Sequence, residues 1–183
     1  GKKRAVRLIC SVNGKAENVD IGSDELVFIT LGSNTEQSGF GDQTHPAVAP
    51  DGIGPAWELW ENIAAQSDDF GNPQKFCGDR AGSNWESATI TCFDDKIPAY
   101  IAKLMSWTVS RQPHFAVQKP NEIVAWVYGL FSDTKGDYVK KTMSECTGEE
   151  ICMEWLYHIG VPVDEIPELA KHHSVTIPCM MPY

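Results

Sequence analysis

The sequence lacks the features that would mark a membrane-spanning or nucleic-acid-binding protein. No apolar run approaches the ~20 residues that a helix needs to cross a bilayer. Positive charge is scarce: 15 Lys and Arg stand against 25 Asp and Glu, and the net charge of -10 opposes binding to nucleic-acid phosphates. The 183 residues, 42% of them hydrophobic, suffice for one core, since a domain has about 100–200 residues.

The common catalytic and metal-binding motifs are missing as well. There is no G-x-S-x-G, H-E-x-x-H, P-loop or G-x-G-x-x-G pattern. No C-x-x-C occurs among the six cysteines, and none of the five histidines stands near a cysteine at zinc-ligand spacing. We therefore expect no metal site and reduced cysteines. An apolar secretory segment is also lacking, so we expect a cytoplasmic protein, and the start at Gly1 suggests a piece of a longer chain.

Strand and helix patterns interleave along the chain, which predicts a mixed α/β (α+β) fold. Asn13-Gly14 separates two strand-like runs and predicts a hairpin. The apolar run within residues 24–33 is nearly continuous, as in a parallel-sheet strand that is buried on both faces. Further strands are predicted over residues 87–93, 105–110 and 122–131, and helices over residues 55–64, 94–103 and 147–159.

One polar strand face is a candidate binding site. Strict alternation after Met105 would place the hydroxyls of Ser106, Thr108 and Ser110 on one face, and Arg111 and His114 follow directly. Hydroxyl, guanidinium and imidazole donors without a competing carboxylate are suited to hold a carboxylate or phosphate. Composition favours a binding site no more than the alternative, a half-solvated strand whose polar face only contacts water.

Eight strings, in order along essentially the whole chain, carry a family resemblance. They are SVNGK (11–15), NVDIG (18–22), GSNTE (32–36), NWESAT (84–89), RQPHF (111–115), WVYGLF (126–131), EWLYH (154–158) and PCMMPY (178–183). Together they resemble the oleate hydratase family, also called myosin-cross-reactive antigen. Its members are FAD-dependent enzymes that add water across the cis double bond of an unsaturated fatty acid, such as oleate, to give a hydroxy fatty acid.

The resemblance implies that this chain is the middle part of an FAD-dependent two-domain flavoprotein. Residues 1–38 would be a return segment of the FAD-binding domain, residues 39–174 the fatty-acid-binding domain, and residues 175–183 a strand returning toward the FAD-binding domain. The family's dinucleotide fingerprint and its residues for water activation and protonation lie upstream. We therefore expect no catalytic residue here and no activity from the isolated piece. For the full-length protein we expect a homodimer, and peripheral membrane contact stays open.

The family motif T-x-N-R-Q-P-H, which holds the fatty-acid carboxylate, maps onto Thr108, Ser110 and His114. Ser110 departs from it, because the family usually has Asn there and a hydroxyl supplies one donor instead of two. A second departure lies between Lys103 and Leu104, where the family carries a longer, Gly-containing segment. We expect that a loop has been omitted there.

Gly32 and Ser33 are the candidate flavin-proximal residues, because they end a run that resembles the returning strand of FAD-binding domains. The alternative is that Gly-Ser only makes a turn. Two other functions stay open: a redox flavoenzyme of the same architecture, desaturase-like or amine-oxidase-like, and a lipid-binding module without catalysis.

Overall fold

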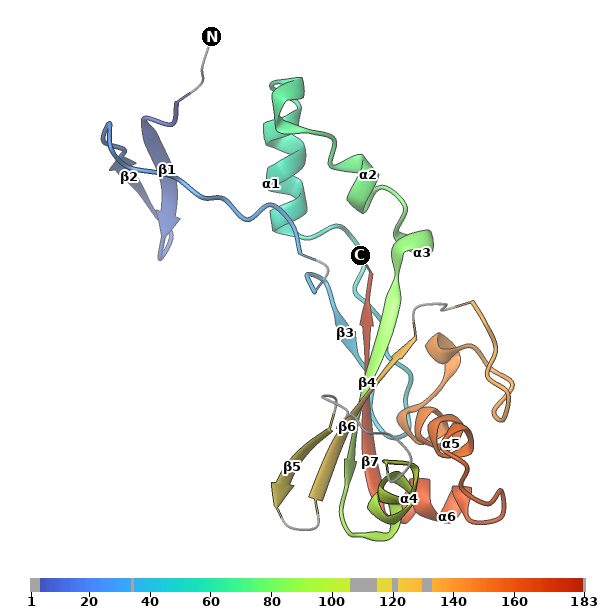
Figure 1. The fold of residues 1–183 in the computed structure, drawn as a ribbon. Coiled ribbons are helices and arrows are strands. Elements are labelled where there is room, and N and C mark those ends of the chain that lie inside the picture. The colour runs from blue at the N-terminus through green and yellow to red at the C-terminus, as the bar shows by residue number, and fades with distance from the viewer. Residues whose placement is uncertain (1–3, 34, 106–114, 120–121, 130–132, 183) are drawn as a thin grey trace. The chain divides into compact units, whose positions relative to one another are not determined.

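The computed structural model describes residues 4–33, 35–105, 115–119, 122–129 and 133–182. The chain divides into two compact units, residues 1–31 and residues 32–183 (Figure 1). The assignment of residues 1–38, 39–174 and 175–183 to functional domains stays a prediction.

The first unit contains the predicted hairpin. Strands β1 (Arg7–Val12) and β2 (Lys15–Asp20) pair antiparallel. Asn13 and Gly14, with φ of 51° and 78°, form the turn between them. Two successive positive φ angles suit the right-handed twist of a hairpin, and Asn-Gly adopts them readily. The hairpin prediction is confirmed.

The strand predicted over residues 24–33 is wrong for this structure. The segment has no regular secondary structure beyond a turn at its start, and Leu26 and Phe28 are 82% and 89% exposed. A strand that is buried on both faces needs paired neighbours and covering layers, and the described part of the chain supplies neither here.

The second unit is built on one five-stranded sheet in the order β3-β7-β4-β6-β5. Its strands are β3 (Gly39–Phe40), β4 (Trp85–Cys92), β5 (Phe115–Lys119), β6 (Glu122–Gly129) and β7 (Ser174–Met181). All neighbours are antiparallel, so the parallel sheet suggested by the apolar run is absent from the described residues. β4 and β6 confirm two predicted strands. The predicted strand over residues 105–110 is wrong at Met105, which ends a helix, and its other residues lie outside the described ranges.

The described helices are α1 (Pro55–Ala64), α2 (Gln74–Cys77), α3 (Arg80–Ser83), α4 (Lys96–Met105), α5 (Gly148–His158) and α6 (Ile166–His172), with 3-10 turns η1 (Asp68–Phe70) and η2 (Met143–Glu145). α1, α4 and α5 confirm the three predicted helices. α5 begins with the predicted capping box, in which the Thr147 side chain accepts from the Glu150 N–H and the Glu150 side chain accepts from the Thr147 N–H.

Helices α4, α5 and α6 cover one face of the sheet (Figure 1). Alternate residues of β4, among them Ile90 and Cys92, point into this interface and are fully buried. The predicted apolar stripe of α5 packs here, with Leu156 fully buried and Trp155 and Ile159 partly buried. The core is therefore the layer between the sheet and these three helices.

All six cysteines are free thiols, and four of them are buried. None of the helices in the described ranges has the length and hydropathy required to cross a membrane.

Candidate functional site

The face of the sheet opposite the helices is the candidate functional site, and we call it the open face. Side chains that face each other across antiparallel strands share one face, so the register of β4 defines rows across it. From β6 and β7, the flanking pairs are Val124 and Val175 for Thr91, Trp126 and Ile177 for Thr89, and Tyr128 and Cys179 for Ser87. Trp85 is flanked on one side, by Met181 of β7. Phe40 of β3 lies beside Cys179. Hydroxyls of the central strand thus alternate with apolar side chains of its neighbours.

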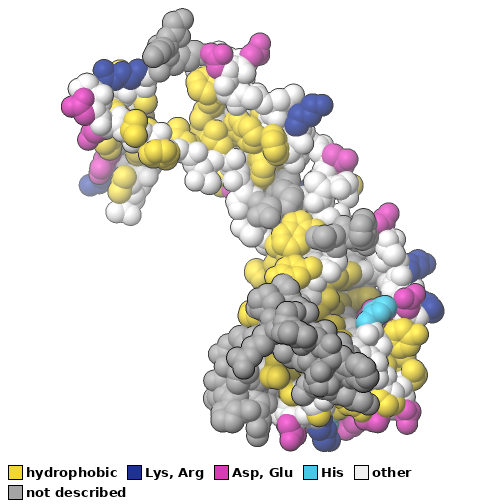
Figure 2. Space-filling view, viewed as in Figure 1, with side chains coloured by type: hydrophobic (Ala, Val, Ile, Leu, Met, Phe, Trp, Pro, Cys, Tyr) yellow, Lys and Arg dark blue, Asp and Glu magenta, His cyan; other side chains and the backbone are white. Residues whose placement is uncertain are grey.

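Large apolar side chains of the open face reach the surface. Phe40 is 71% exposed, Tyr128 54%, and Trp126 and Ile177 39% each. Figure 2 shows hydrophobic side chains at the surface over β3, β4 and β7. Trp85 and Tyr128 stack with ring centroids 6.1 Å apart. Contiguous exposed apolar groups of this kind mark binding sites more often than isolated ones do.

The dimensions of the open face suit one acyl chain. From Thr91 to Trp85 the rows extend over roughly 20 Å, at about 3.3 Å per strand residue. The hydrocarbon core of a bilayer, which is two acyl chains thick, measures about 30 Å, so one chain is roughly 15 Å long. An acyl chain of this length can cross the two middle rows, those of Thr89 and Ser87, where the exposed Trp126, Ile177 and Tyr128 lie, and can reach one neighbouring row.

The predicted carboxylate-binding residues Thr108, Ser110 and His114 lie outside the described residues, so their role stays a prediction. What the structure does give is the start of β5 at Phe115, the residue directly after His114. Phe115 pairs with Ala125, the neighbour of Trp126 in β6. The chain that carries the predicted anchor thus joins the sheet at edge strand β5, beside the middle of the open face.

Gly32 and Ser33 lie at the start of the turn that leads to β3, and both contact other residues of the protein. Gly32 has a φ of 86°, and a Cβ there would come within 2.6 Å of the Trp57 ring. The Ser33 carbonyl accepts from Trp57 Nε1 at 3.3 Å and from the Glu36 N–H at 3.0 Å. The Ser33 hydroxyl lies 2.8 Å from the Thr35 hydroxyl. Packing against Trp57 explains the glycine by itself, and the flavin contact stays a prediction.

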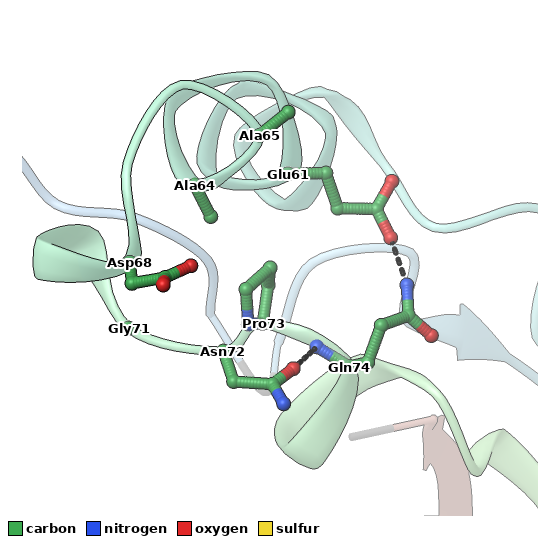
Figure 3. Close-up of a pocket in the computed structure, with 8 residues that line it drawn as sticks. All are labelled: Glu61, Ala64, Ala65, Asp68, Gly71, Asn72, Pro73 and Gln74. Atoms are coloured by element: carbon green, nitrogen blue, oxygen red, sulfur yellow. Dashed lines mark hydrogen bonds between the residues drawn. The ribbon is translucent and has the colours of Figure 1, made fainter.

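A pocket of about 690 Å³ lies between α1, η1 and α2 (Figure 3). Gln74 Nε2 donates to Glu61 Oε1 at 2.5 Å across its rim, and Asn72 Oδ1 accepts from the Gln74 N–H at 3.1 Å. Among its eight labelled lining residues are the carboxylates of Glu61 and Asp68 but no cationic side chain. It is therefore poorly suited to a fatty-acid carboxylate, and none of the predicted site residues lines it.

A second pocket, of about 460 Å³, lies on the helix side of the sheet, between the end of β6, residues 134–143 and α5. One wall is fixed by Glu154, whose carboxylate accepts from the N–H groups of Asp137 at 2.6 Å, Tyr138 at 2.9 Å and Val139 at 2.8 Å. Burial raises the pKa of Glu154, but these three donors outweigh it and hold the pKa below its ordinary value. The loop beside this pocket is therefore anchored to α5.

The open face was missed in the sequence, although a signal for it was present. Residues 85–92 alternate: Thr89 and Thr91 lie between the buried Ala88, Ile90 and Cys92, and Ser87 precedes Ala88. That pattern identifies the buried face of β4. Which strands flank β4, and that Trp126 and Ile177 come to lie beside Thr89, depends on register between segments far apart in sequence.

Comparison with known proteins identifies relatives of this chain that are hydratases by name. The chain is 43% identical over 209 aligned positions to an oleate hydratase from Streptococcus pyogenes, covering 100% of this chain and 35% of that protein. It is 29% identical over 205 positions to a linoleate hydratase from Lactiplantibacillus plantarum, covering 93% of this chain and 36% of that protein. The chain thus spans about a third of the length of the curated relatives it matches.

The first alignment is longer than the chain itself, 209 positions against 183 residues, so that relative has residues with no counterpart here. This agrees with an expected longer segment in the family, although the alignment length alone does not place it between Lys103 and Leu104. The model of the MCRA family matches residues 1–183. This chain belongs to the MCRA family.

Proposed function

We propose that this chain is the fatty-acid-binding part of a hydratase that adds water to the cis double bond of an oleate-type unsaturated fatty acid. The single observation that carries the proposal is the open face of the central sheet, on which the large apolar side chains of Trp126, Tyr128 and Ile177 are exposed side by side. The two curated relatives, named oleate hydratase and linoleate hydratase, support the choice of a fatty acid as its occupant.

In the proposed arrangement the sheet positions the substrate. Thr108, Ser110 and His114 hold the carboxylate by charge-assisted hydrogen bonds. The acyl chain lies on Trp126, Tyr128 and their neighbours. Fixing the head and the chain places the alkene at a defined position relative to the general acid and the general base, and so selects which carbon receives water.

The chemical step would use groups outside this chain. A general acid gives a proton to one alkene carbon, and a general base takes a proton from water as its oxygen bonds the other carbon. The addition is redox-neutral. We therefore propose that this chain contributes binding and orientation, and that it is inactive alone.

FAD, and the two-domain flavoprotein fold, belong to the proposal for the full-length protein. At the predicted flavin-proximal residues, Trp57 fills the space beside Gly32, and Ser33 forms hydrogen bonds with Thr35 and Trp57. The flavin contact at Gly32 and Ser33 stays a prediction, and the family's dinucleotide fingerprint is expected upstream of this chain. A cytoplasmic location, homodimerisation and peripheral membrane contact stay predictions.

Two single variants of the full-length protein, Thr108→Ala and His114→Ala, test the assignment of these residues to the fatty-acid carboxylate. Each hydrogen bond to a charged group contributes about 1.5–3 kcal/mol, so each variant is expected to weaken oleate binding by roughly 10- to 150-fold. Binding is measured by calorimetry with stearate in place of oleate, because stearate lacks the double bond and is not hydrated during the titration. Thr134→Ala, a change in an exposed loop on the helix side, serves as the control. Unchanged affinity in both anchor variants would remove the assignment.

An anaerobic assay separates hydration from redox chemistry. With the full-length protein, oleate and no electron acceptor, the proposal predicts formation of a hydroxy fatty acid. A strict requirement for an electron acceptor would favour a desaturase-like or oxidase-like enzyme. Tight binding without any product would favour a lipid-binding module.

A further inference from the structure

A buried carboxyl group on the helix side of the sheet has no role in the proposed hydration. Glu86 belongs to β4 and points to the same side as Ala88, Ile90 and Cys92. It is 0% exposed, and neither carboxyl oxygen has a hydrogen-bond partner among the described residues. An ionised carboxylate in such a place costs several kcal/mol, so an orphaned one requires an explanation.

The Glu86 carboxyl group is covered by residues of the segment 134–146, which precedes α5. Glu86 pairs across the sheet with Gly129 and Met180. Met143 occupies the space that a side chain at Gly129 would fill. Cys146 packs with Ala88 in a small core cluster, against which Met143 also packs. Met143 and Cys146 therefore close the sheet over the end of β4 that bears Glu86.

The same residues form the inner wall of the 460 Å³ pocket. Gly129, Met143 and Cys146 line it beside residues 134–141. The loop end of this segment is anchored, because Glu154 binds three of its N–H groups. Displacement of the Met143 side chain would join the pocket to the Glu86 carboxyl and let water reach it.

Among the described residues, no charge near Glu86 offsets its burial. Burial alone raises the pKa of Glu86 to about 7. From the covering segment it faces the Cys146 thiol, whose pKa burial and Glu150 raise to about 12, and from β7 it is influenced by the Cys179 thiol, whose pKa burial also raises. Both thiols are neutral at pH 7. Lys141, the nearby cation of the segment, is paired with Glu150 at 2.5 Å.

We propose that Glu86 is a proton-dependent latch: Met143 and Cys146 close over the sheet while the Glu86 carboxyl is neutral, and its ionisation releases them and opens the adjoining pocket. The direction of the pH dependence of closure follows from the burial of the Glu86 carboxyl group. The closed form binds the proton more tightly than the open, hydrated form, so closure is favoured at low pH. Closure weakens as the pH rises from the ordinary carboxyl range to the closed-form pKa of about 7, and it levels off above that pH.

Hydrogen exchange in the full-length protein tests the latch at two amides of this segment. The Cys146 N–H donates to the Met143 carbonyl at 3.0 Å, and the Glu145 N–H donates to the Thr142 carbonyl at 3.0 Å. After correction for intrinsic exchange rates, their protection is expected to fall about tenfold between pH 6 and pH 8, because an open-state carboxyl titrates at its ordinary pKa and the closed one near 7. In Glu86→Gln, which keeps the shape but cannot ionise, protection is expected to be the same at both pH values.

Glu149→Gln, a carboxylate removed from the first turn of α5, is the matched control and is expected to keep the wild-type pH response. Equal pH responses of the wild type and Glu86→Gln would overturn the proposal. So would lower protection of Glu86→Gln than of the wild type at pH 6, because that result would mean that the carboxyl is held by a partner. The wild-type measurement does not depend on whether a variant folds. Protection of the wild-type amides that does not change between pH 6 and pH 8 would overturn the proposal by itself.

Discussion

Trp126→Asp in the full-length protein is expected to lower the affinity for an unsaturated fatty acid by about 10- to 100-fold while leaving the sheet folded. An aromatic side chain has about 150–250 Å² of surface to bury, and Trp126 keeps 39% exposed, so an acyl chain can cover roughly 60–100 Å² of it. At about 25 cal/mol per Å², counted on both surfaces, this corresponds to roughly 3–5 kcal/mol, of which ordering costs remove part. Binding titrations with oleate give the measurement.

Tyr157→Asp is the matched control for Trp126→Asp. Tyr157 is also 39% exposed, but it lies on α5, on the helix side of the sheet, where it stacks on Tyr138. Its replacement is expected to leave fatty-acid affinity within about twofold, because it does not contact the open face. Equal losses in the two variants would show that general destabilisation, and not the open face, sets the affinity.

Leu156→Ala is expected to lower the free energy of unfolding by about 3–5 kcal/mol, the usual cost when a fully buried leucine leaves a cavity. Leu156 is 0% exposed and lies in the central cluster, together with residues of β4, α4 and α6. Since small domains are stable by only about 5–15 kcal/mol, this one change removes a large fraction of the total. Chemical denaturation monitored by tryptophan fluorescence gives the value.

Leu59→Ala is the control for the core. Leu59 lies on α1 and is 45% exposed, so its truncation is expected to cost less than about 1 kcal/mol. A loss for Leu156→Ala as small as that for Leu59→Ala would contradict the position of the core between the sheet and α4, α5 and α6.

Local signals in the sequence predict the local elements of this fold well. Thr147 and Glu150 predict the start of α5, and Asn13-Gly14 predicts the hairpin, because each feature depends on hydrogen bonds or backbone angles within a few residues. The alternation of Ala88, Ile90 and Cys92 likewise identifies the buried face of β4.

Features that depend on distant segments escape such reasoning. The apolar run over residues 24–33 predicts a buried strand, but a strand forms only where another chain segment pairs with it. The antiparallel order β3-β7-β4-β6-β5 brings residues 39–40 and 174–181 together, and no local pattern encodes that pairing. Glu86 shows the same limit: its inward position follows from alternation, but its lack of a partner depends on Met143 and Cys146 far along the chain.

Photo-crosslinking tests the central claim, that the open face carries the acyl chain, most directly. The full-length protein would be incubated with an unsaturated fatty acid that bears a diazirine on its acyl chain, irradiated, digested and analysed by peptide mass spectrometry. The account predicts crosslinks on open-face residues of β4, β6 and β7, foremost Trp126, Tyr128 and Ile177, and their loss when oleate competes. Competable crosslinks found only on α4, α5 and α6, with none on these strands, would contradict it.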